Sequence, residues 1–404
     1  MKKVSITTVY KGFNYGSSLQ AYASKEYLSS LGYDAEIIGY RDGVIKGRDI
    51  RFNKLLVMFL RSFWRPSLFR KTFSTYKTSL QKQISEDAKL AFLEFADRRL
   101  QVKKYSWQGL KAYASDANVL ACVCGSDQIW NATNIYIDPI FYLKFAPTQK
   151  RIAYAPSFGK SEIPEYNQEI IRKNISEFDY LSVREEQGAE IIKDLTGIDA
   201  PVMIDPTLLL DKNDWLNTVN DLKVCEREKG KYILLYFLDK PSSTAIQYIE
   251  RLLKVYHCSA IAIPYQHSEF ADFECSESVS TGPLQFIDLV SNALFVCTDS
   301  FHGTAFAMNL NTPFLTFKRD YGTAADQSSR ITSLLDKFEL EERFISETEP
   351  GGKLRLEYQM SFENSNRLLG CERQKAKEYL LNSLASIESK TNCGGSHEKQ
   401  CINR

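Results

Sequence analysis

The sequence is poor in histidine, and it has no long apolar run, no excess of one charge and no paired cysteines. Its formal net charge is +1 over 404 residues, so no overall field favours nucleic acid as a partner. No run reaches the ~20 apolar residues that a membrane-spanning helix needs, and the start, MKKVSITTVY, lacks the apolar core of a signal peptide. Nine cysteines without a CxxC pair favour buried thiols in a reducing compartment over a disulfide framework or a zinc site. We therefore expect a cytoplasmic protein.

Short β-branched runs alternate with stretches of helical periodicity, which is typical of an α/β fold with mostly parallel sheets. In the first half the strand-like runs are 3–10, 34–40, 117–125, 151–159, 180–185 and 200–206. In the second half they are 231–239, 259–266, 294–299 and 313–319. Two doubly wound domains facing each other would form a cleft at the carboxyl ends of their strands, where α/β proteins bind ligands.

The boundaries follow from shifts in composition. We expect a first domain at 1–210, a polar linker region at 211–230 and a second domain at 231–345. C-terminal helices at 346–390 are placed to return to the first domain, and 391–404 has the composition of a disordered tail.

A basic and aromatic stretch, 41–116, interrupts the alternation and is expected to be a helical insertion. Between Lys46 and Lys77 it holds nine Lys and Arg residues and one acid, Asp49. One interpretation is a surface that contacts an anionic membrane peripherally. The other is a packed helical hairpin with solvated cations, since Pro66 interrupts any single amphipathic helix. Both remain open on the sequence alone.

His302 stands between a strand-like run and a helix-like run, in the sequence CTDSFHGTAF. A helix N-terminus at the end of a strand attracts anions, and Gly303 would allow a ligand to approach the backbone. Ser300 and Thr304 add hydroxyl groups. An imidazole there can bind a phosphate and exchange a proton near neutral pH. The alternative is a structural histidine beside the helix start.

Three other strand ends carry polar groups that would face the same cleft. In CGSDQ, Asp127 is a candidate base for a sugar hydroxyl, or a helix cap. Arg184 can clamp a carboxylate or phosphate, or pair with a neighbouring glutamate. The remaining candidates for substrate binding are Asn14, Gly16, Ser126 and Gln128. The loop NYGSS is neither GxGxxG nor a P-loop, and no cluster has metal-ligand spacing.

Seven fragments in order resemble the polysaccharide pyruvyl transferase family: NYGSSLQAYA, CGSDQIWN, YAPSFG, SVRE, MIDPTLLL, TDSFHGTAFA and SSRITSLL. The resemblance implies two Rossmann-like domains in a GT-B-like arrangement. It also implies transfer of pyruvate from phosphoenolpyruvate to a sugar, without a further cofactor, with His302 and Arg184 contacting the donor. One departure is Ser300, where the family often has arginine. Lys318, Arg319 and Arg330 are candidates for the missing cation.

These elements give a hypothesis in which His302 is the general acid and Asp127 the base for the acceptor. The acceptor is expected to be a lipid-linked precursor of a capsule or exopolysaccharide, met at the inner face of the plasma membrane. One alternative is a GT-B glycosyltransferase that uses a nucleotide sugar, with Asp299 or Asp288 near the cleft. The other is a non-catalytic sugar-binding paralogue, which Ser300 would favour.

Overall fold

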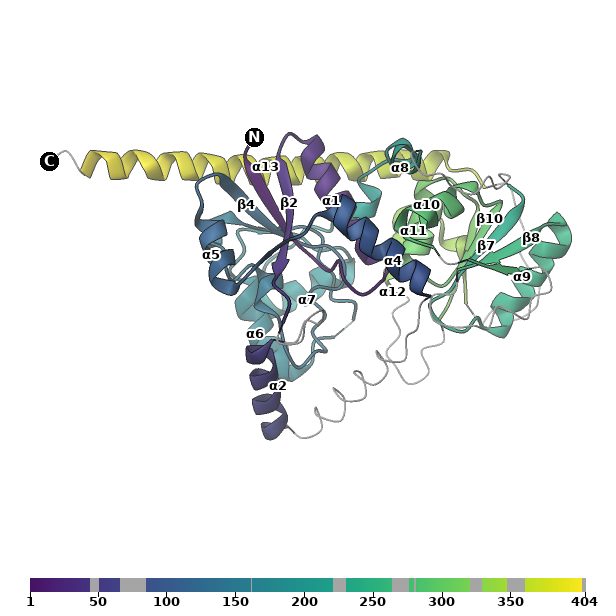
Figure 1. Ribbon diagram of the computed structural model, residues 1–404, viewed down its shortest axis with the longest axis horizontal. Coiled ribbons are helices and arrows are strands. Elements are labelled where there is room, and N and C mark those ends of the chain that lie inside the picture. The colour runs from purple at the N-terminus through teal and green to yellow at the C-terminus, as the bar shows by residue number, and fades with distance from the viewer. Residues whose placement is uncertain are drawn as a thin grey trace.

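The structure is a computed structural model that describes residues 1–43, 51–65, 85–160, 162–220, 230–263, 276–279, 281–319, 329–346 and 360–401. Two α/β domains lie side by side, and a long C-terminal helix runs along both (Figure 1). The relative position of the two parallel sheets decides where a ligand can sit.

The first domain is built on a parallel sheet with strand order β3-β2-β1-β4-β5-β6. Its strands are β1 (Lys3–Thr7), β2 (Asp34–Tyr40), β3 (Lys103–Tyr105), β4 (Val119–Cys124), β5 (Arg151–Ala153) and β6 (Tyr180–Leu181). The helices of this part of the chain are α1 (Tyr15–Ser30), α2 (Phe52–Trp64), α4 (Glu86–Phe95), α5 (Trp107–Ser115), α6 (Glu165–Ile175) and α7 (Glu186–Thr196). All six residues of β4 are buried, as expected for a central parallel strand covered on both faces.

The second domain repeats the pattern with strand order β12-β11-β10-β7-β8-β9. Its strands are β7 (Tyr232–Tyr236), β8 (Ser259–Ala262), β9 (Ser276–Ser278), β10 (Phe295–Thr298), β11 (Phe314–Phe317) and β12 (Phe344–Ile345). Its helices are α9 (Ser243–Tyr256), α10 (Pro283–Asn292), α11 (Phe301–Asn309) and α12 (Ser329–Lys337). Both sheets have the doubly wound order of Rossmann folds, with a switch point at β1/β4 and another at β7/β10. The predicted fold class, two Rossmann-like domains in a GT-B-like arrangement, is confirmed.

A continuous apolar core joins the two domains. Tyr15, at the start of α1, stacks on Phe286 of α10 with ring centroids 4.8 Å apart, and its hydroxyl lies 2.7 Å from that of Thr281. Trp215 packs edge-on against Phe306 of α11, with ring centroids 5.1 Å apart. Because these contacts are buried and aromatic, they hold the facing edges of the sheets in one arrangement.

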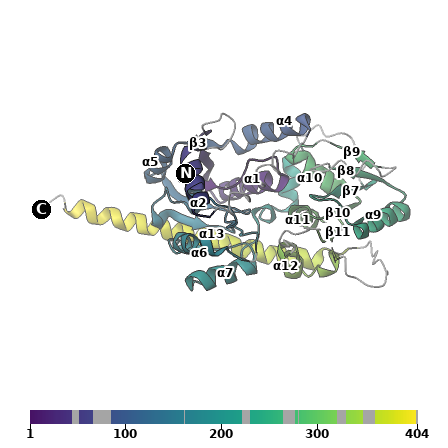
Figure 2. The same cartoon turned by 90° about the horizontal axis from the view of Figure 1, so that it is seen from below.

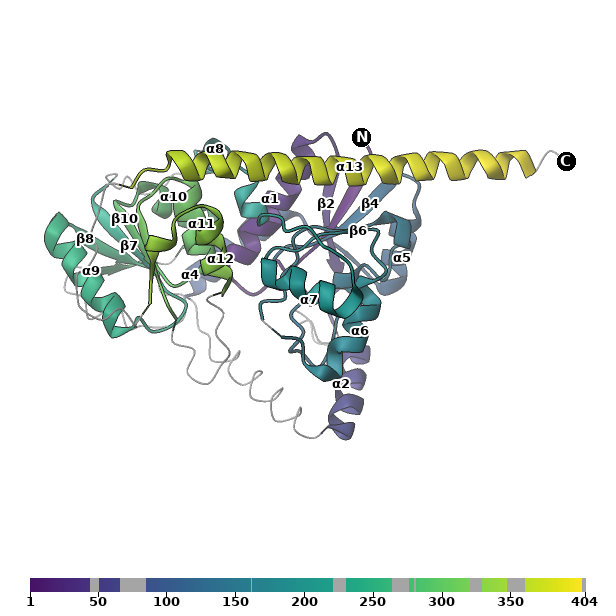
Figure 3. The ribbon, with the colours of Figure 1, turned by 180° about the vertical axis from the view of Figure 1, so that it is seen from behind.

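Helix α13 (Glu363–Cys401) braces this arrangement from one side (Figures 1 and 3). Its buried apolar residues are Leu369, Ala376, Leu380, Leu384 and Ile387. Arg373 reaches Asn309 of the second domain at 2.7 Å, and the Tyr379 hydroxyl donates to the Ala153 carbonyl of the first at 3.0 Å. Figure 2 shows α4 on the side of the molecule opposite to α13.

The structure differs from the predicted domain boundaries in the 41–116 insertion and the linker region. The insertion is not wholly helical, because β3 lies within it and pairs in parallel with β2; 44–50 and 66–84 lie outside the described residues. In the linker region, Lys212–Val219 form helix α8, which begins with a capping box between Asp211 and Asp214. Residues 221–229 are not described.

Two further expectations need correction. The run 200–206 makes only one bridge, Val183 to Val202, and then the turn η4 (Pro206–Leu208), because Pro201 and Pro206 have no N–H to donate to a ladder. The C-terminal region expected to be a disordered tail is helical as far as Cys401. Among the described residues, no helix is both long enough and apolar enough to span a bilayer.

Candidate active site

The first turn of α11 places His302 at the interface between the domains. Ser300 is the N-cap of this helix, and its side chain accepts the Gly303 N–H at 3.4 Å. A Cβ on Gly303 would lie 2.4 Å from the Thr298 hydroxyl oxygen, so glycine allows this turn to pack on the end of β10. The Thr304 hydroxyl contacts the Ser300 carbonyl at 2.9 Å and is fully buried. Ser300, Gly303 and Thr304 therefore shape the turn, and the Thr304 hydroxyl bonds to Ser300 and Thr316 within the second domain.

Glycine at position 16 is required for the imidazole to fit against the first domain. A Cβ on Gly16 would lie 2.0 Å from His302 Nδ1, a distance that no side chain tolerates. Asn14 caps the same helix, α1, by accepting the Ser17 N–H at 3.1 Å. The Ser17 hydroxyl in turn donates to Asp127 Oδ2 at 2.5 Å. The start of α1 thus brings Asp127 and His302 to the same region, although they come from different domains.

Asp205 lies between the two residues on which the prediction depends. Its Oδ2 accepts a hydrogen bond from Arg184 Nη1 at 2.7 Å and lies 3.9 Å from His302 Nε2. Ser126 donates to the same oxygen at 3.1 Å, while Oδ1 accepts the Thr207 N–H at 3.0 Å. Arg184 and His302 therefore converge on one buried carboxylate.

Burial and charge set the protonation states at this point. Burial lowers the pKa of His302 below its usual value, against the opposing influence of Asp205 and Asp127. Burial would by itself raise the pKa of Asp205, but the charge of the adjacent Arg184 guanidinium holds this pKa below its usual value. At neutral pH we therefore expect a neutral imidazole beside an ionised Asp205–Arg184 pair.

Several buried polar atoms of these side chains make no hydrogen bond among the described residues. They are Arg184 Nε, Arg184 Nη2 and His302 Nε2. Arg184 Nε forms an ion pair with Glu185 Oε2 at 3.4 Å, and the guanidinium carbon lies 4.6 Å from the ring centre of Phe301. Because buried polar groups are almost always hydrogen-bonded, guanidinium donors at a domain interface that make no hydrogen bond among the described residues suit an anionic ligand.

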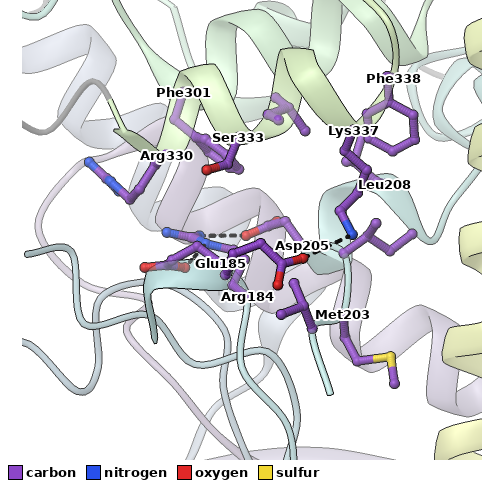
Figure 4. Close-up of a pocket in the computed structure, with 14 residues that line it drawn as sticks. Arg184, Glu185, Met203, Asp205, Leu208, Phe301, Arg330, Ser333, Lys337 and Phe338 are labelled. Carbon is purple, nitrogen blue, oxygen red and sulfur yellow. Dashed lines mark hydrogen bonds and ion pairs between the residues drawn. The ribbon is translucent and has the colours of Figure 1, made fainter. Parts of the chain in front are cut away.

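A pocket opens beside this cluster, with an empty volume of about 420 Å³ that includes space open to solvent. Arg184, Glu185 and Asp205 line it from the first domain, and Phe301 and α12 line it from the second (Figure 4). On α12 the lining residues are Arg330, Ser333, Leu334 and Lys337. The Arg330 guanidinium lies 6.0 Å from the Phe301 ring centre, so two cations flank one ring. His302 lies next to the pocket rather than on its wall.

The other predicted cations and polar groups are placed differently. Lys318 follows β11 and is not among the lining residues, and Arg319 donates to Asp299 at 3.0 Å. Asp299 also accepts the Leu238 and Asp239 N–H groups, at 2.6 and 3.1 Å, so it braces the β7/β10 switch point.

Two polar groups after β4 support the loop. Ser126 donates to Ala155 as well as to Asp205, and Gln128 accepts from Asn131 at 3.1 Å. Among the described residues, no group of three or more His, Cys, Asp and Glu side chains could hold a metal ion.

Sequence reasoning missed Asp205, Phe301 and Lys337. The motif MIDPTLLL contained a signal for Asp205, because an acid before proline often caps a turn and η4 follows directly. For Lys337, the neighbouring residues in the sequence give no sign of a role in a binding site. It lines the pocket because α12 crosses the interface, where it lies 3.8 Å from Glu186 of the first domain.

Comparison with known proteins gives one family and several distant structures. A family model described as polysaccharide pyruvyl transferase matches residues 14–321. UDP-N-acetylglucosamine 2-epimerase from Rickettsia bellii is 10% identical, with a TM-score of 0.45, over 96% of this chain and 98% of that one. The UDP-GlcNAc 2-epimerase of Neisseria meningitidis, bound to UDP-GlcNAc, is 10% identical, with a TM-score of 0.47, over 95% of this chain and 100% of that one. A comparison with curated proteins found no match.

Proposed function

Because the chain belongs to the polysaccharide pyruvyl transferase family, we propose that it moves pyruvate from phosphoenolpyruvate to a sugar of a lipid-linked polysaccharide precursor. The product is a pyruvate ketal on two hydroxyls, and phosphate is released. The observation that carries this proposal is the convergence of Arg184 and His302, from different domains, on one carboxylate, where Arg184 Nη2 and His302 Nε2 make no hydrogen bond among the described residues.

The donor carries a phosphate and a carboxylate, and the pocket offers cations for both. Arg184 Nε and Nη2 form the edge of a guanidinium that binds such anions through two parallel hydrogen bonds. Arg330 faces the same Phe301 ring from α12 and takes the place of the arginine expected at Ser300. Of the predicted alternatives, Lys318 is not among the lining residues, and Arg319 is paired with Asp299.

Asp205 is the positioning residue of this arrangement. Its carboxylate holds Arg184 Nη1 by a hydrogen bond. As a result, Nε and Nη2 of the guanidinium point away from Asp205. It also offsets the guanidinium charge while the donor is absent. Without this partner the buried cation would be strongly destabilised.

The reaction needs two proton transfers from the acceptor hydroxyls. Protonation of the methylene carbon of phosphoenolpyruvate makes an oxocarbenium centre at its second carbon, and a sugar hydroxyl adds there. Asp127 accepts the hydroxyl proton. The carbon–oxygen bond to phosphate then breaks, and the neighbouring hydroxyl closes the ketal. One hydroxyl proton replaces the proton added to carbon, and the other leaves with phosphate.

His302 is suited to move the proton that the donor needs. Its imidazole is neutral before the donor binds, because burial lowers its pKa. A bound dianion would raise this pKa, so the imidazole would gain a proton when the donor arrives. Proton transfer by a positioned side chain contributes about 10²–10⁴-fold to a rate.

The test is phosphate release from phosphoenolpyruvate by the purified chain, with and without a glycan acceptor that carries vicinal or 1,3-related hydroxyls. We expect release that depends on the acceptor. A glycan mass gain that corresponds to a pyruvate ketal would identify the product. Thermal stabilisation by a nucleotide sugar but not by phosphoenolpyruvate would contradict the proposal.

A further inference from the structure

Glu185 places a carboxylate in the wall of the pocket, directly after Arg184 in the sequence. It stands just before the first turn of α7 but is only 8% exposed, and its side chain does not cap the helix. Its Oε1 accepts hydrogen bonds from the Ser157 hydroxyl and, at 3.5 Å, from the Gly159 N–H. Its Oε2 forms the ion pair with Arg184 Nε (Figure 4) and makes no hydrogen bond among the described residues. A buried carboxylate oxygen in a pocket wall that lacks a hydrogen bond is suited to a hydroxyl group of a ligand.

The other carboxylates of this interface have both oxygens engaged. Asp205 Oδ2 accepts a hydrogen bond from Arg184, and its Oδ1 accepts a backbone N–H. Asp127 Oδ2 accepts the Ser17 hydroxyl, and its Oδ1 accepts the backbone N–H that follows it. Because a carboxylate oxygen has two lone pairs, Asp127 can still accept from one ligand hydroxyl. Glu185 Oε2 keeps its full hydrogen-bonding capacity within the described part of the chain.

Ser157, in the sequence YAPSFG, connects Glu185 to Asp127. This serine is fully buried, and its hydroxyl donates to Glu185 Oε1 while its backbone N–H donates to the Asp127 carbonyl at 2.9 Å. The Gly159 N–H donates to the serine hydroxyl at 3.0 Å, which fixes the direction of that hydroxyl. One short loop therefore holds two acidic residues beside the same guanidinium. A ligand with two neighbouring hydroxyls would meet a carboxylate for each.

We propose that Glu185 is a second proton acceptor, which takes the proton of the sugar hydroxyl that closes the ketal. This inference rests on the proposed function, in which Asp127 accepts the proton of the first hydroxyl. In the closing step the second hydroxyl forms its bond to the second carbon of the pyruvyl group while its O–H bond breaks. The proton passes to Glu185 Oε2 and then to the departing phosphate in the same site, which leaves protonated. Each hydroxyl thus has its own base.

A simple counter-ion of Arg184 would behave differently from a base. If Glu185 only held the guanidinium in place, its neutral replacement would loosen Arg184 and weaken the binding of phosphoenolpyruvate. If Glu185 is a base, the same replacement removes an anion beside the donor, so donor binding is kept or strengthened while turnover falls. The two roles therefore predict opposite signs for the change in donor affinity.

The experiment compares Glu185→Gln with the wild type in the full chain. Glutamine keeps an oxygen that can accept from the Ser157 hydroxyl. We expect kcat for acceptor-dependent phosphate release to fall by about 10²-fold or more, and phosphoenolpyruvate to bind at least as tightly by calorimetry. The matched control is Glu190→Gln, an exposed residue of the same helix, which should keep both values.

Glu185→Asp provides a second variant in case the glutamine variant does not fold. It keeps the charge beside Arg184 but withdraws the oxygens by one methylene, so kcat should fall at least tenfold at an unchanged melting temperature. A folded Glu185→Gln or Glu185→Asp with turnover near the wild-type rate would overturn the role of Glu185, and so would a loss of donor affinity in Glu185→Gln as large as its loss of kcat. Both results leave the proposed function standing. A wild type that releases no phosphate with any acceptor would remove the proposed function and this role together.

Discussion

The Asp205 carboxylate lies 3.9 Å from the imidazole of His302, although Asp205 precedes turn η4 in the first domain and His302 lies in the first turn of α11 in the second. The same carboxylate oxygen holds Arg184 at 2.7 Å. The proposed donor site is therefore assembled only when the two domains pack together. Because α13 and the Tyr15 contacts fix that packing, the site is formed before any donor binds.

Replacing His302 with alanine should reduce acceptor-dependent phosphate release by about 10²–10⁴-fold, because the proton donor is lost. The fold should survive, since the imidazole Nε2 makes no hydrogen bond within the described protein. The measurement is kcat together with the melting temperature. His257→Asn is the control, because this exposed residue ends α9 in a left-handed conformation that asparagine tolerates. Turnover near the wild-type rate in His302→Ala would remove its catalytic role.

Gly16→Ala should impair catalysis, although it removes no side chain that contacts the substrate. The added Cβ would overlap with His302 Nδ1, 2.0 Å away, so the imidazole or α1 must move. We expect a loss of kcat of at least tenfold. Gly370→Ala on α13 is the matched control, because its Cβ meets nothing within 4 Å, and removing a helix glycine should stabilise the fold by about 0.5–1 kcal/mol. Equal activity in the two variants would contradict the packing of His302 on Gly16.

Asp205→Ala should cost about 3–5 kcal/mol of unfolding free energy, because it leaves the Arg184 guanidinium buried without its partner. The double variant Asp205→Ala/Arg184→Met should recover part of that stability, since no unpaired charge remains. Urea unfolding of the two variants measures the difference. If the double variant is no more stable than Asp205→Ala, the ion pair does not hold the site together.

Acid should destabilise the fold in two steps. The pKa of His302 is lowered by burial, so below its ordinary value of about 6.5 the unfolded chain gains a proton that the folded chain resists. The free energy of unfolding should thus fall as the pH drops from about 6.5, and His302→Asn should flatten this slope. Asp205 has a lowered pKa, so its contribution is present above about pH 4 and is lost as the pH falls through its folded value. Urea titrations at pH 7.5, 6.5 and 5.5 test the first step, and an unchanged slope in His302→Asn would contradict it.

The sequence predicted those features of the fold that are determined by neighbouring residues in the chain, and it did not predict those that depend on contacts between distant segments. Apolar runs such as 119–124 predicted the central strands, since a strand buried on both faces must be apolar. The short edge strands β3, β9 and β12 have two or three residues each, and β3 reads KKY, which carries no apolar signal. They exist because a neighbouring strand offers an unpaired edge.

The same distinction applies to the site. Arg184 and His302 were predicted to face one cleft because both follow strands at the carboxyl edge of a parallel sheet, and the structure places both beside Asp205. Asp205 and Lys337 were missed because their positions depend on how η4 and α12 cross between the domains. Conversely, the hydroxyl of Thr304 has the right chemistry but is used up by Ser300 and Thr316 within the second domain. Spacing does not show which way a side chain points.

The central claim is that Arg184 and His302 bind one small dianion together, and calorimetric titration with phosphoenolpyruvate tests it most directly. We predict that Arg184→Met and His302→Asn each weaken binding at least tenfold, and that their effects are not additive, because both groups contact the same ligand. We also predict that the wild type takes up a proton on binding, seen by comparing buffers of different ionisation enthalpy, and that His302→Asn does not. Binding of phosphoenolpyruvate with unchanged affinity in both variants would contradict the account.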